Sequence, residues 1–333
     1  MIGHDTEIRA AKLVDLPFIG RVERGAILDA EFAFTRAAPD PHSAVLSSIF
    51  LPQRGLHTLV GRDGRQQIVG QLRLKPADHL AQIVYMAPPL EENADDTVWL
   101  RMMDALAAEA GRRGAYMLTA EVAEDSPLFT TMRASGFAVY ARQEIWARPS
   151  DAPLPAHIKP APLTEDTEED SLAIQLLYSN IVPRLVQPIA VPSRDSEGLV
   201  YRHDGRIQGY IAVSEGKCGI YLMPFLHPDI LFSEASAIIA GAIALHPRAD
   251  RLPVYVCVRR YQDWLEDGLV ELGFKPWTQQ AVMVRHIAAG VRHASFAPIS
   301  AHSKALDGIP NPIRPPTSQT KSVLEIIDQP GES

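Results

Sequence analysis

The sequence predicts an α/β protein in which one mixed-sheet unit occurs twice in tandem. Strand-like and helix-like segments alternate along 333 residues, a length typical of two domains of about 100–200 residues each. One order of motifs occurs in both halves of the chain. Each half closes with a Gly-Phe pair before a strand-like segment, at Gly136-Phe137 and at Gly273-Phe274.

The first half begins with a short strand from Ile8 that leads into a helix. Apolar alternation around an Asp-Gly pair predicts a hairpin over residues 59–72. The motif Y-x-x-P-x-L follows at residues 85–90, and a strand is expected at 116–122. Between them, apolar side chains spaced i, i+3, i+4, i+7, i+8 and i+11 predict an amphipathic helix: Trp99, Met102, Met103, Leu106, Ala107 and Ala110.

The second half repeats this order from Ile158. A second Asp-Gly pair predicts a hairpin over residues 199–211, and Y-x-x-P-x-L returns at residues 221–226. Residues 235–245 are apolar on all sides, which predicts a buried helix. A strand is expected at 253–258.

These patterns divide the chain into two domains, a linker and a tail. Residues 1–147 and 158–290 are the predicted domains, and the proline-rich residues 148–157 are the linker. Residues 291–333 are rich in Pro and Ser, so we expect a disordered tail. Within the tail, residues 321–328 have a helical pattern, which makes the tail a candidate contact for a protein partner.

Composition restricts the classes of partner. Hydrophobic residues make up 46% of the chain, and the net charge of −8 without a Lys/Arg block argues against nucleic acid. Cys218 and Cys257 are the only cysteines, too few for a disulfide framework or a thiolate metal site. The N-terminus lacks a signal-peptide core, and the longest apolar run is too short to cross a membrane. We therefore expect a cytoplasmic protein without a membrane partner.

The element order resembles the GNAT superfamily of N-acetyltransferases over residues 8–147 and 158–287. The features that carry the resemblance are the opening IRAAKLVDLP, a strand-end proline before an amphipathic helix, and helices that end in ASGF and ELGF. The resemblance implies the acyl-CoA N-acyltransferase fold, with acetyl-CoA bound where two parallel strands splay apart. It also implies acetyl transfer to a small-molecule amine or a peptide.

The resemblance also implies candidate cofactor contacts. In the family, the pantetheine arm pairs with the fourth strand, and the pyrophosphate binds at the start of the next helix. Gln262 matches an Asn that begins the family's late helix. The candidates are Met86 and Ala87 in the first copy, and Leu222, Met223, His227, Ser233 and Gln262 in the second.

The cofactor loops depart from the family pattern. Within PPLEENADDTVW, residues 88–99, Glu91 takes the place of a basic residue, and Asp96 that of a glycine. A carboxylate about 4 Å from a phosphate is repelled by about 4 kcal/mol near a protein surface. We therefore expect the acids to stabilise the helix start themselves, with Asp95, Asp96 or Thr97 as the cap. The second copy also lacks the family glycines.

The catalytic positions are altered as well. Met132 and Leu269 occupy the positions where the family often has a proton-donating Tyr. Glu121 is a candidate general base, with a solvent-facing strand residue as the alternative. The eleven histidines form no metal-binding motif, so no metal is expected. Two functions stay open: an acetyltransferase with divergent cofactor sites, or a catalytically inactive pseudoenzyme that binds a ligand or serves as an interaction scaffold.

Overall fold

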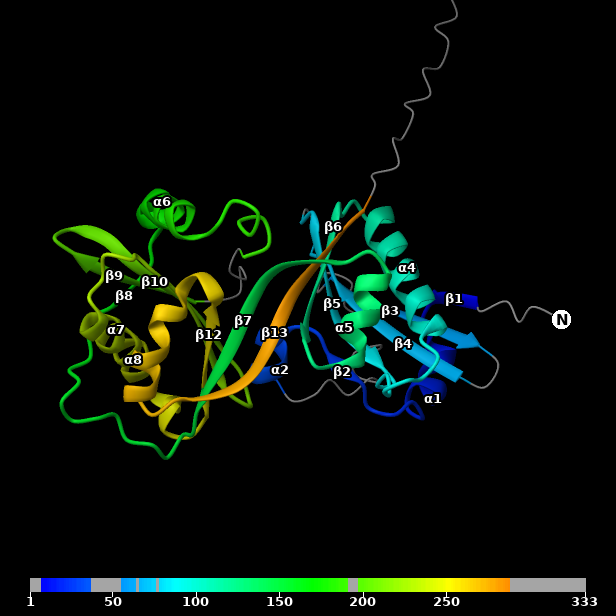
Figure 1. Ribbon diagram of the computed structural model, residues 1–333, viewed down its shortest axis with the longest axis horizontal. Helices are drawn as coiled ribbons and strands as arrows, with labels where there is room; N and C mark the ends of the chain where they lie inside the picture. Colours follow the sequence, from blue (N-terminus) through cyan, green and yellow to red (C-terminus); the bar gives the residue numbers. More distant parts are fainter. Residues whose placement is uncertain (1–6, 37–54, 64–65, 76–77, 191–196, 288–333) are drawn as a thin grey trace, which may run out of the picture. The chain divides into compact units, whose positions relative to one another are not determined.

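The computed structural model describes residues 7–36, 55–63, 66–75, 78–190 and 197–287 (Figure 1). These residues fall within one compact unit, Met1–Gly290. The predicted disordered tail and its candidate partner contact lie outside the described residues, as does the turn of the first hairpin. No helix in the described ranges is long and apolar enough to cross a membrane.

In the described part of the first half there are seven strands and several helices. Its strands are β1 (Glu7–Ala10), β2 (Ala26–Ile27), β3 (Leu56–Asp63), β4 (Gln66–Arg73), β5 (Leu80–Ala87), β6 (Met117–Ala123) and β7 (Ala138–Arg148). Its helices are η1 (Leu13–Asp15), α1 (Leu16–Ile19), α2 (Ala30–Thr35), α4 (Thr97–Arg112) and α5 (Pro127–Ala134).

The second half repeats this order, except that its described residues contain no counterpart of β2. Its strands are β8 (Thr164–Glu165), β9 (Glu197–His203), β10 (Arg206–Glu215), β11 (Ile220–Leu226), β12 (Val254–Arg259) and β13 (Lys275–His286). Its helices are η3 (Glu168–Asp170), α6 (Ser171–Ile181), α7 (Phe232–Leu245), η4 (Pro247–Asp250), η5 (Arg260–Leu265) and α8 (Glu266–Glu271).

All the strands form one mixed sheet. Its order is β1-β3-β4-β5-β6-β13-β7-β12-β11-β10-β9-β8, and β2 pairs with β5 off this path. The parallel pairs are β5 with β6 and β11 with β12, and the other pairs are antiparallel. The predicted mixed-sheet α/β class is therefore confirmed.

The last strand of each half lies against the other half. β13 pairs with β6 of the first half, while β7 pairs with β12 of the second half. β7 and β13 also pair with each other, and they run side by side through the middle of the sheet (Figure 1). The exchange keeps the symmetry of the repeat, since each half gives one strand and receives one. The predicted domain boundaries at residues 147 and 158 stay a prediction.

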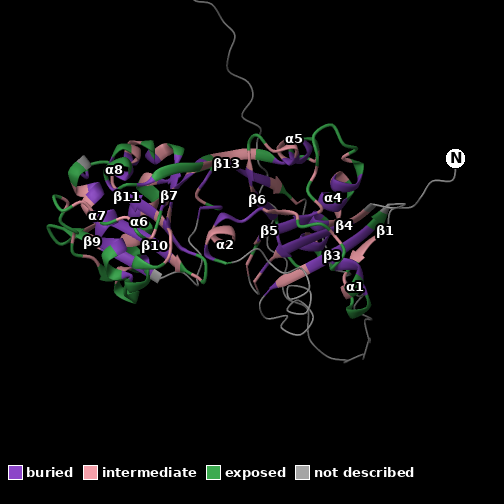
Figure 2. Cartoon of the chain, turned by 90° about the horizontal axis from the view of Figure 1, so that it is seen from below, coloured by how far each residue is buried: buried purple, intermediate pink, exposed green. Residues whose placement is uncertain are grey.

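Helices cover apolar faces of the sheet in both halves (Figure 2). The apolar face predicted for residues 99–110 is buried in α4 and packs on sheet residues such as Leu72 and Leu118. The apolar helix predicted at 235–245 is α7, whose Ile238 and Ile239 are buried over β11 and β12. Apolar spacing for the first helix and a uniform apolar run for the second therefore predicted both principal helices and their burial.

The two Gly-Phe pairs end helices in the same way. Phe137 N donates to Met132 O at 3.1 Å, and Phe274 N donates to Leu269 O at 2.9 Å. Gly136 and Gly273 have positive φ angles of 89° and 83°, a conformation that glycine adopts without a Cβ penalty. In each pair the left-handed conformation of the glycine ends the helix, and the chain then continues into β7 or β13.

Candidate functional site

The first candidate site is the gap between β5 and β6. These strands pair in parallel only where residues 80–82 meet residues 117–119, and they diverge beyond. β2 occupies the gap and pairs antiparallel with β5, with Ala26 opposite Met86. The protein's own chain therefore lies where the family resemblance implies a pantetheine arm.

Leu28 bridges the two diverging strands. Its N–H donates to Val84 O at 2.9 Å, and its carbonyl accepts from Glu121 N at 2.9 Å. The inserted segment also packs tightly at Gly25. A Cβ added to this residue would lie only 1.8 Å from Met86 O. Val84 O and Glu121 N, one from each diverging strand, are thus paired within the chain.

Met86 and Ala87, predicted as cofactor contacts, lie on this occupied strand. Both are buried and pair with β4, and Met86 also pairs with Ala26 of β2 on its other side. Their assignment stays a prediction, but the strand edge that it requires is already paired at Met86. A pantetheine arm does not fit the first gap as the chain fills it.

At the start of α4, acidic side chains of the chain itself accept the available hydrogen bonds. Asp95 Oδ1 accepts hydrogen bonds from Thr97 N at 3.0 Å and from Thr97 Oγ1 at 2.6 Å. These bonds lower the pKa of Asp95 below its ordinary value. Asp96 Oδ2 accepts from Thr131 Oγ1 at 2.8 Å. Of the three predicted caps, Asp95 bonds the helix start, and the residues present do not fit a pyrophosphate.

The second gap, between β11 and β12, is filled by a side chain. The strands pair in parallel where residues 220–222 meet residues 254–256. Beyond this point Gln262 lies against β11, in the amide orientation that satisfies both of its ends. Its Nε2 donates to Pro224 O at 3.0 Å, and its Oε1 accepts from Leu226 N at 3.1 Å. The structure places Gln262 at the predicted gap, where its amide occupies the strand edge.

The other second-copy candidates do not converge on one site. Leu222 is fully buried in the core beneath α7, whereas Met223 lines a cavity on the opposite side of the sheet. His227 is partly exposed, and its Nδ1 accepts from Asp229 N at 3.2 Å. Ser233 is exposed at the start of α7.

Acidic side chains surround the start of α7 too. Asp267 and Glu271 of α8 line the hollow that contains Ser233. Glu234 Oε2 accepts from Leu231 N at 3.4 Å, which occupies one donor of the first turn. These carboxylates belong to α7 and α8. The sequence of the loop before α7 therefore did not indicate how much negative charge lies at the start of this helix. This helix start does not fit a pyrophosphate either.

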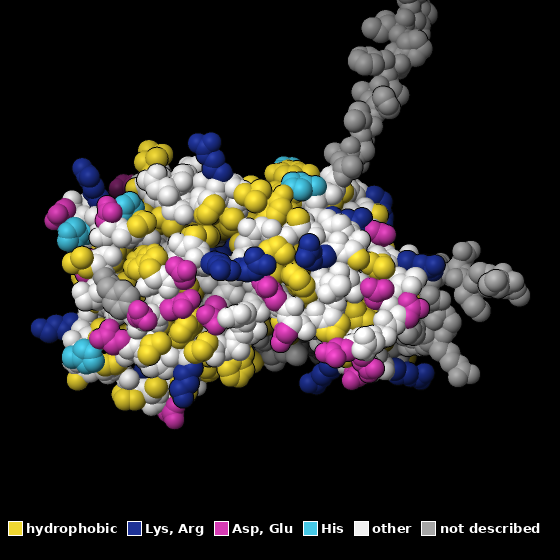
Figure 3. Space-filling model, in the orientation of Figure 1, with side chains coloured by type: hydrophobic (Ala, Val, Ile, Leu, Met, Phe, Trp, Pro, Cys, Tyr) yellow, Lys and Arg dark blue, Asp and Glu magenta, His cyan; other side chains and the backbone are white. Residues whose placement is uncertain are grey.

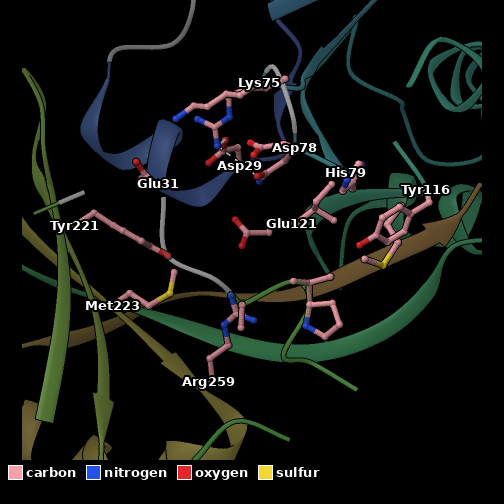
Figure 4. Close-up of a pocket in the computed structure, with 17 residues that line it drawn as sticks. Asp29, Glu31, Lys75, Asp78, His79, Tyr116, Glu121, Tyr221, Met223 and Arg259 are labelled. Atoms are coloured by element: carbon pink, nitrogen blue, oxygen red, sulfur yellow. Dashed lines mark hydrogen bonds and ion pairs between the residues drawn. The ribbon is translucent and has the colours of Figure 1, made fainter. Parts of the chain in front are cut away.

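A cavity of about 400 Å³ lies where the two halves meet, and both halves line it (Figure 4). It contains Glu121 and Met223 from the sequence predictions. Its charged lining residues are Asp29, Glu31, Arg73, Lys75, Asp78, Glu121 and Arg259. Among the residues that the structure describes, no group of three or more His, Cys, Asp or Glu side chains is arranged to hold a metal.

Glu121 projects into this cavity from β6 (Figure 4). Its Oε2 accepts a hydrogen bond from Ala30 N at 2.6 Å, which ties β6 to the start of α2. Burial raises the pKa of Glu121, and the nearby charge of Asp29 raises it further, while Arg259 acts in the opposite direction. Glu121 is therefore a cavity residue rather than a solvent-facing strand residue, the alternative expected from the sequence.

Asp29 and Glu31 add two more carboxylates at α2. Asp29 caps α2 through Phe32 N at 3.1 Å and forms an ion pair with Arg73 at 2.7 Å. Glu31 Oε1 accepts from Ser214 Oγ at 3.0 Å. Burial, followed by the charge of Asp29, raises the pKa of Glu31. The segment that fills the first gap thus continues into two carboxylates, Asp29 and Glu31, that line the cavity.

Arg259 enters the cavity from the end of β12 (Figure 4). The residue is 3% exposed, and its Nε and Nη1 atoms have no hydrogen-bond partner among the described residues. Burial acts to lower the pKa of Arg259, while Cys257, Tyr261 and Glu121 act to raise it, and the net direction is upward. Arginine stays protonated in proteins, so the guanidinium is charged while deeply buried.

Sequence reasoning missed Arg259 and Asp29 as site residues. The sequence contains a weak signal for Arg259, because this charged residue directly follows the apolar strand segment PVYVCV. Asp29 resembles any helix cap before a short helix. Acidic and basic side chains are interspersed on the face shown in Figure 3, without a large basic patch typical of a nucleic-acid interface.

The comparisons with known proteins identify the fold. No protein-family model and no curated protein matches the sequence. Among solved structures, a GCN5-related N-acetyltransferase from Sphaerobacter thermophilus matches with a TM-score of 0.54 and 14% identity, over 85% of this chain and 96% of that one. A tandem GNAT protein from the clavulanic acid biosynthesis pathway matches with a TM-score of 0.49 and 16% identity, over 85% and 99% of the two chains.

The likeness to the Sphaerobacter thermophilus structure confirms the GNAT fold predicted from the motifs. That the unit occurs twice follows from the chain's own element order, which recurs in its two halves. At 14% identity the likeness establishes the fold alone, and activity and substrate depend on the chain's own residues.

Proposed function

We propose that this chain is a non-catalytic, GNAT-fold protein that binds a small ligand in the cavity between its two halves. The observation that carries the proposal is the occupation of the first gap by residues 25–29. Leu28 bonds both Val84 and Glu121, so acetyl-CoA would have to displace a paired backbone segment.

The second copy supports the same proposal by different means. Gln262 is 1% exposed and satisfies Pro224 O and Leu226 N. Displacing it would expose two backbone groups and a buried amide, each at a cost of about 1–3 kcal/mol if unpaired. Acidic side chains at both helix starts disfavour the cofactor's phosphates.

The cavity is the best-formed candidate for ligand binding. Its volume of about 400 Å³ lies in the range of small-molecule sites. The lining combines apolar side chains with convergent charged groups, among them the buried Arg259. This combination of features is typical of a binding site rather than of packing imperfection.

Calorimetric titration of acetyl-CoA into the full chain tests the absence of transfer chemistry. We expect no saturable binding tighter than about 1 mM, equivalent to −4 kcal/mol. A parallel assay of free CoA release, with mixed amines as acceptors, should show no release above the protein-free background. Micromolar binding, or release that depends on the protein, would establish the acetyltransferase alternative.

A further inference from the structure

Arg259 is a buried charge without a counter-ion in contact. Its guanidinium is 3% exposed, and no carboxylate of the described residues lies within ion-pair distance. Glu121 influences it electrostatically across the cavity without touching it. A buried, unpaired charge is strongly unfavourable, so an anionic group in the cavity would stabilise this arrangement.

The opposite part of the cavity has the reverse polarity. Asp29, Glu31, Asp78 and Glu121 lie there together with Lys75 (Figure 4). Arg73 is the second cation of this part of the lining. Arg73 is already paired with Asp29. Carboxylates thus outnumber cations at this end, and a positively charged group beside Glu121 would be stabilised by them.

The remaining lining is mainly apolar. Leu80 and Met117 come from the first half, and Ile189 and Met223 come from the second. Met117 and Ile189 are buried within one hydrophobic cluster that spans the two halves. An aliphatic or aromatic group would bury its surface here, at about 25 cal/mol per Å².

We propose that the cavity binds a small zwitterion with an apolar side chain, an α-amino acid or a close analogue. Its carboxylate lies against Arg259, and its ammonium group lies against Glu121. This inference rests on the proposed ligand-binding function and names the chemical class of the ligand. A simple anion would leave the acidic end uncompensated, and a simple amine would leave Arg259 unpaired.

Titration of the full chain with matched probes tests this class. The probes are L-leucine, L-methionine and L-phenylalanine, each with its amide, which lacks the carboxylate, and its desamino acid, which lacks the ammonium group. We expect saturable binding of at least one amino acid, and at least tenfold weaker binding of its two derivatives. Absence of binding by all three amino acids overturns the proposal, as does equal binding of either derivative.

Substitutions test which side chain holds the carboxylate of the ligand and which holds its ammonium group. Arg259→Gln should abolish binding of the amino acid while leaving the fold intact, since it removes an unpaired buried charge. Glu121→Gln should weaken the amino acid at least tenfold and leave the desamino acid unchanged. The matched control is Arg260→Gln, which alters the adjacent, exposed arginine and should bind like the parent protein. Unchanged binding by Arg259→Gln overturns the proposal.

The outcomes separate this inference from the proposed function. If CoA release depends on the protein while the amino acid still binds through Arg259, the non-catalytic function fails and the ligand class stands. If acetyl-CoA neither binds nor turns over and none of the amino acids binds, the ligand class fails.

Discussion

The backbone N–H of Glu121 donates to the carbonyl of Leu28 at 2.9 Å, across a gap where β5 and β6 no longer pair. The same Glu121 accepts from Ala30 N through its side chain at 2.6 Å. One residue thus holds the inserted segment twice and also faces the cavity. The segment that closes the first gap is therefore held by a residue that also lines the cavity.

Gly25→Ala should destabilise the protein by about 2–3 kcal/mol, because the new Cβ would lie 1.8 Å from Met86 O and a main-chain shift is required. Chemical denaturation measures this change. The matched control is Gly111→Ala in α4, where the added Cβ would lie 2.9 Å from the Cγ2 methyl of Ile287 and from no main-chain atom. The control should cost clearly less than Gly25→Ala, because a side chain rather than the main chain has to shift and because alanine favours helix. Equal effects of the two changes would contradict the close packing of the inserted segment.

Gln262→Ala should cost about 1–3 kcal/mol in the free energy of unfolding, because Pro224 O and Leu226 N lose their partner. The control is Gln279→Ala, which alters an exposed glutamine bonded to Glu144 at 3.3 Å, and it should change stability by less than about 0.5 kcal/mol. A neutral Gln262→Ala would show that the second gap is not held closed by this amide.

The double change Glu91→Arg with Asp96→Gly gives the first copy a charge pattern closer to the family's. It should not produce acetyl-CoA binding tighter than about 1 mM, because residues 25–29 still fill the gap. It should also lower stability by about 1 kcal/mol through loss of the bond from Thr131 to Asp96. Calorimetry and denaturation measure the two effects. A gain in affinity that decreases with added salt would show that charge alone had excluded the cofactor.

The pH dependence of stability should report Glu121. Its pKa is raised in the folded state, chiefly by burial, so its contribution to stability is fully present below the ordinary value of 4.5 and is lost as the pH rises through the folded pKa. Glu121→Gln should therefore be more stable than the parent protein at neutral pH, and the difference should diminish toward pH 4. Denaturation curves across this range measure it. Glu165→Gln, at an exposed position, is the control and should show no such trend.

The sequence contained enough information for the repeated elements and their packing. Helical spacing from Trp99 to Ala110 and the uniform apolar run at 235–245 predict buried faces because side-chain direction follows the helix period. The Gly-Phe pairs predict helix ends because Gly136 and Gly273 tolerate positive φ. These features depend on neighbours along the chain, so local patterns were sufficient.

The features that define the site depend on distant pairing. β2 is a two-residue strand whose partner Met86 lies far along the sequence, and so short a segment has no detectable period. The exchange of β7 and β13 was equally hidden, because β6 and β12 have similar apolar patterns and either could accept either strand. Arg259 is buried among residues distant in sequence, such as Glu121, so the charged residue after PVYVCV does not by itself predict that burial.

Separation of the two halves tests the strand exchange. A chain of residues 1–150 lacks β13, so residues 117–123 of β6 lose the partners that residues 280–286 provide, and β7 loses both of its neighbours. An apolar strand edge of this kind is unstable in isolation. We expect neither residues 1–150 nor residues 151–290 to form a monomeric folded unit. Co-expression of the two should yield a 1:1 complex with the melting behaviour of the intact chain, measured by light scattering and by copurification through a tag on one half. A monomeric first half that unfolds cooperatively would show that β7 can return to its own β6, and that the predicted boundary at residue 147 marks an independent domain.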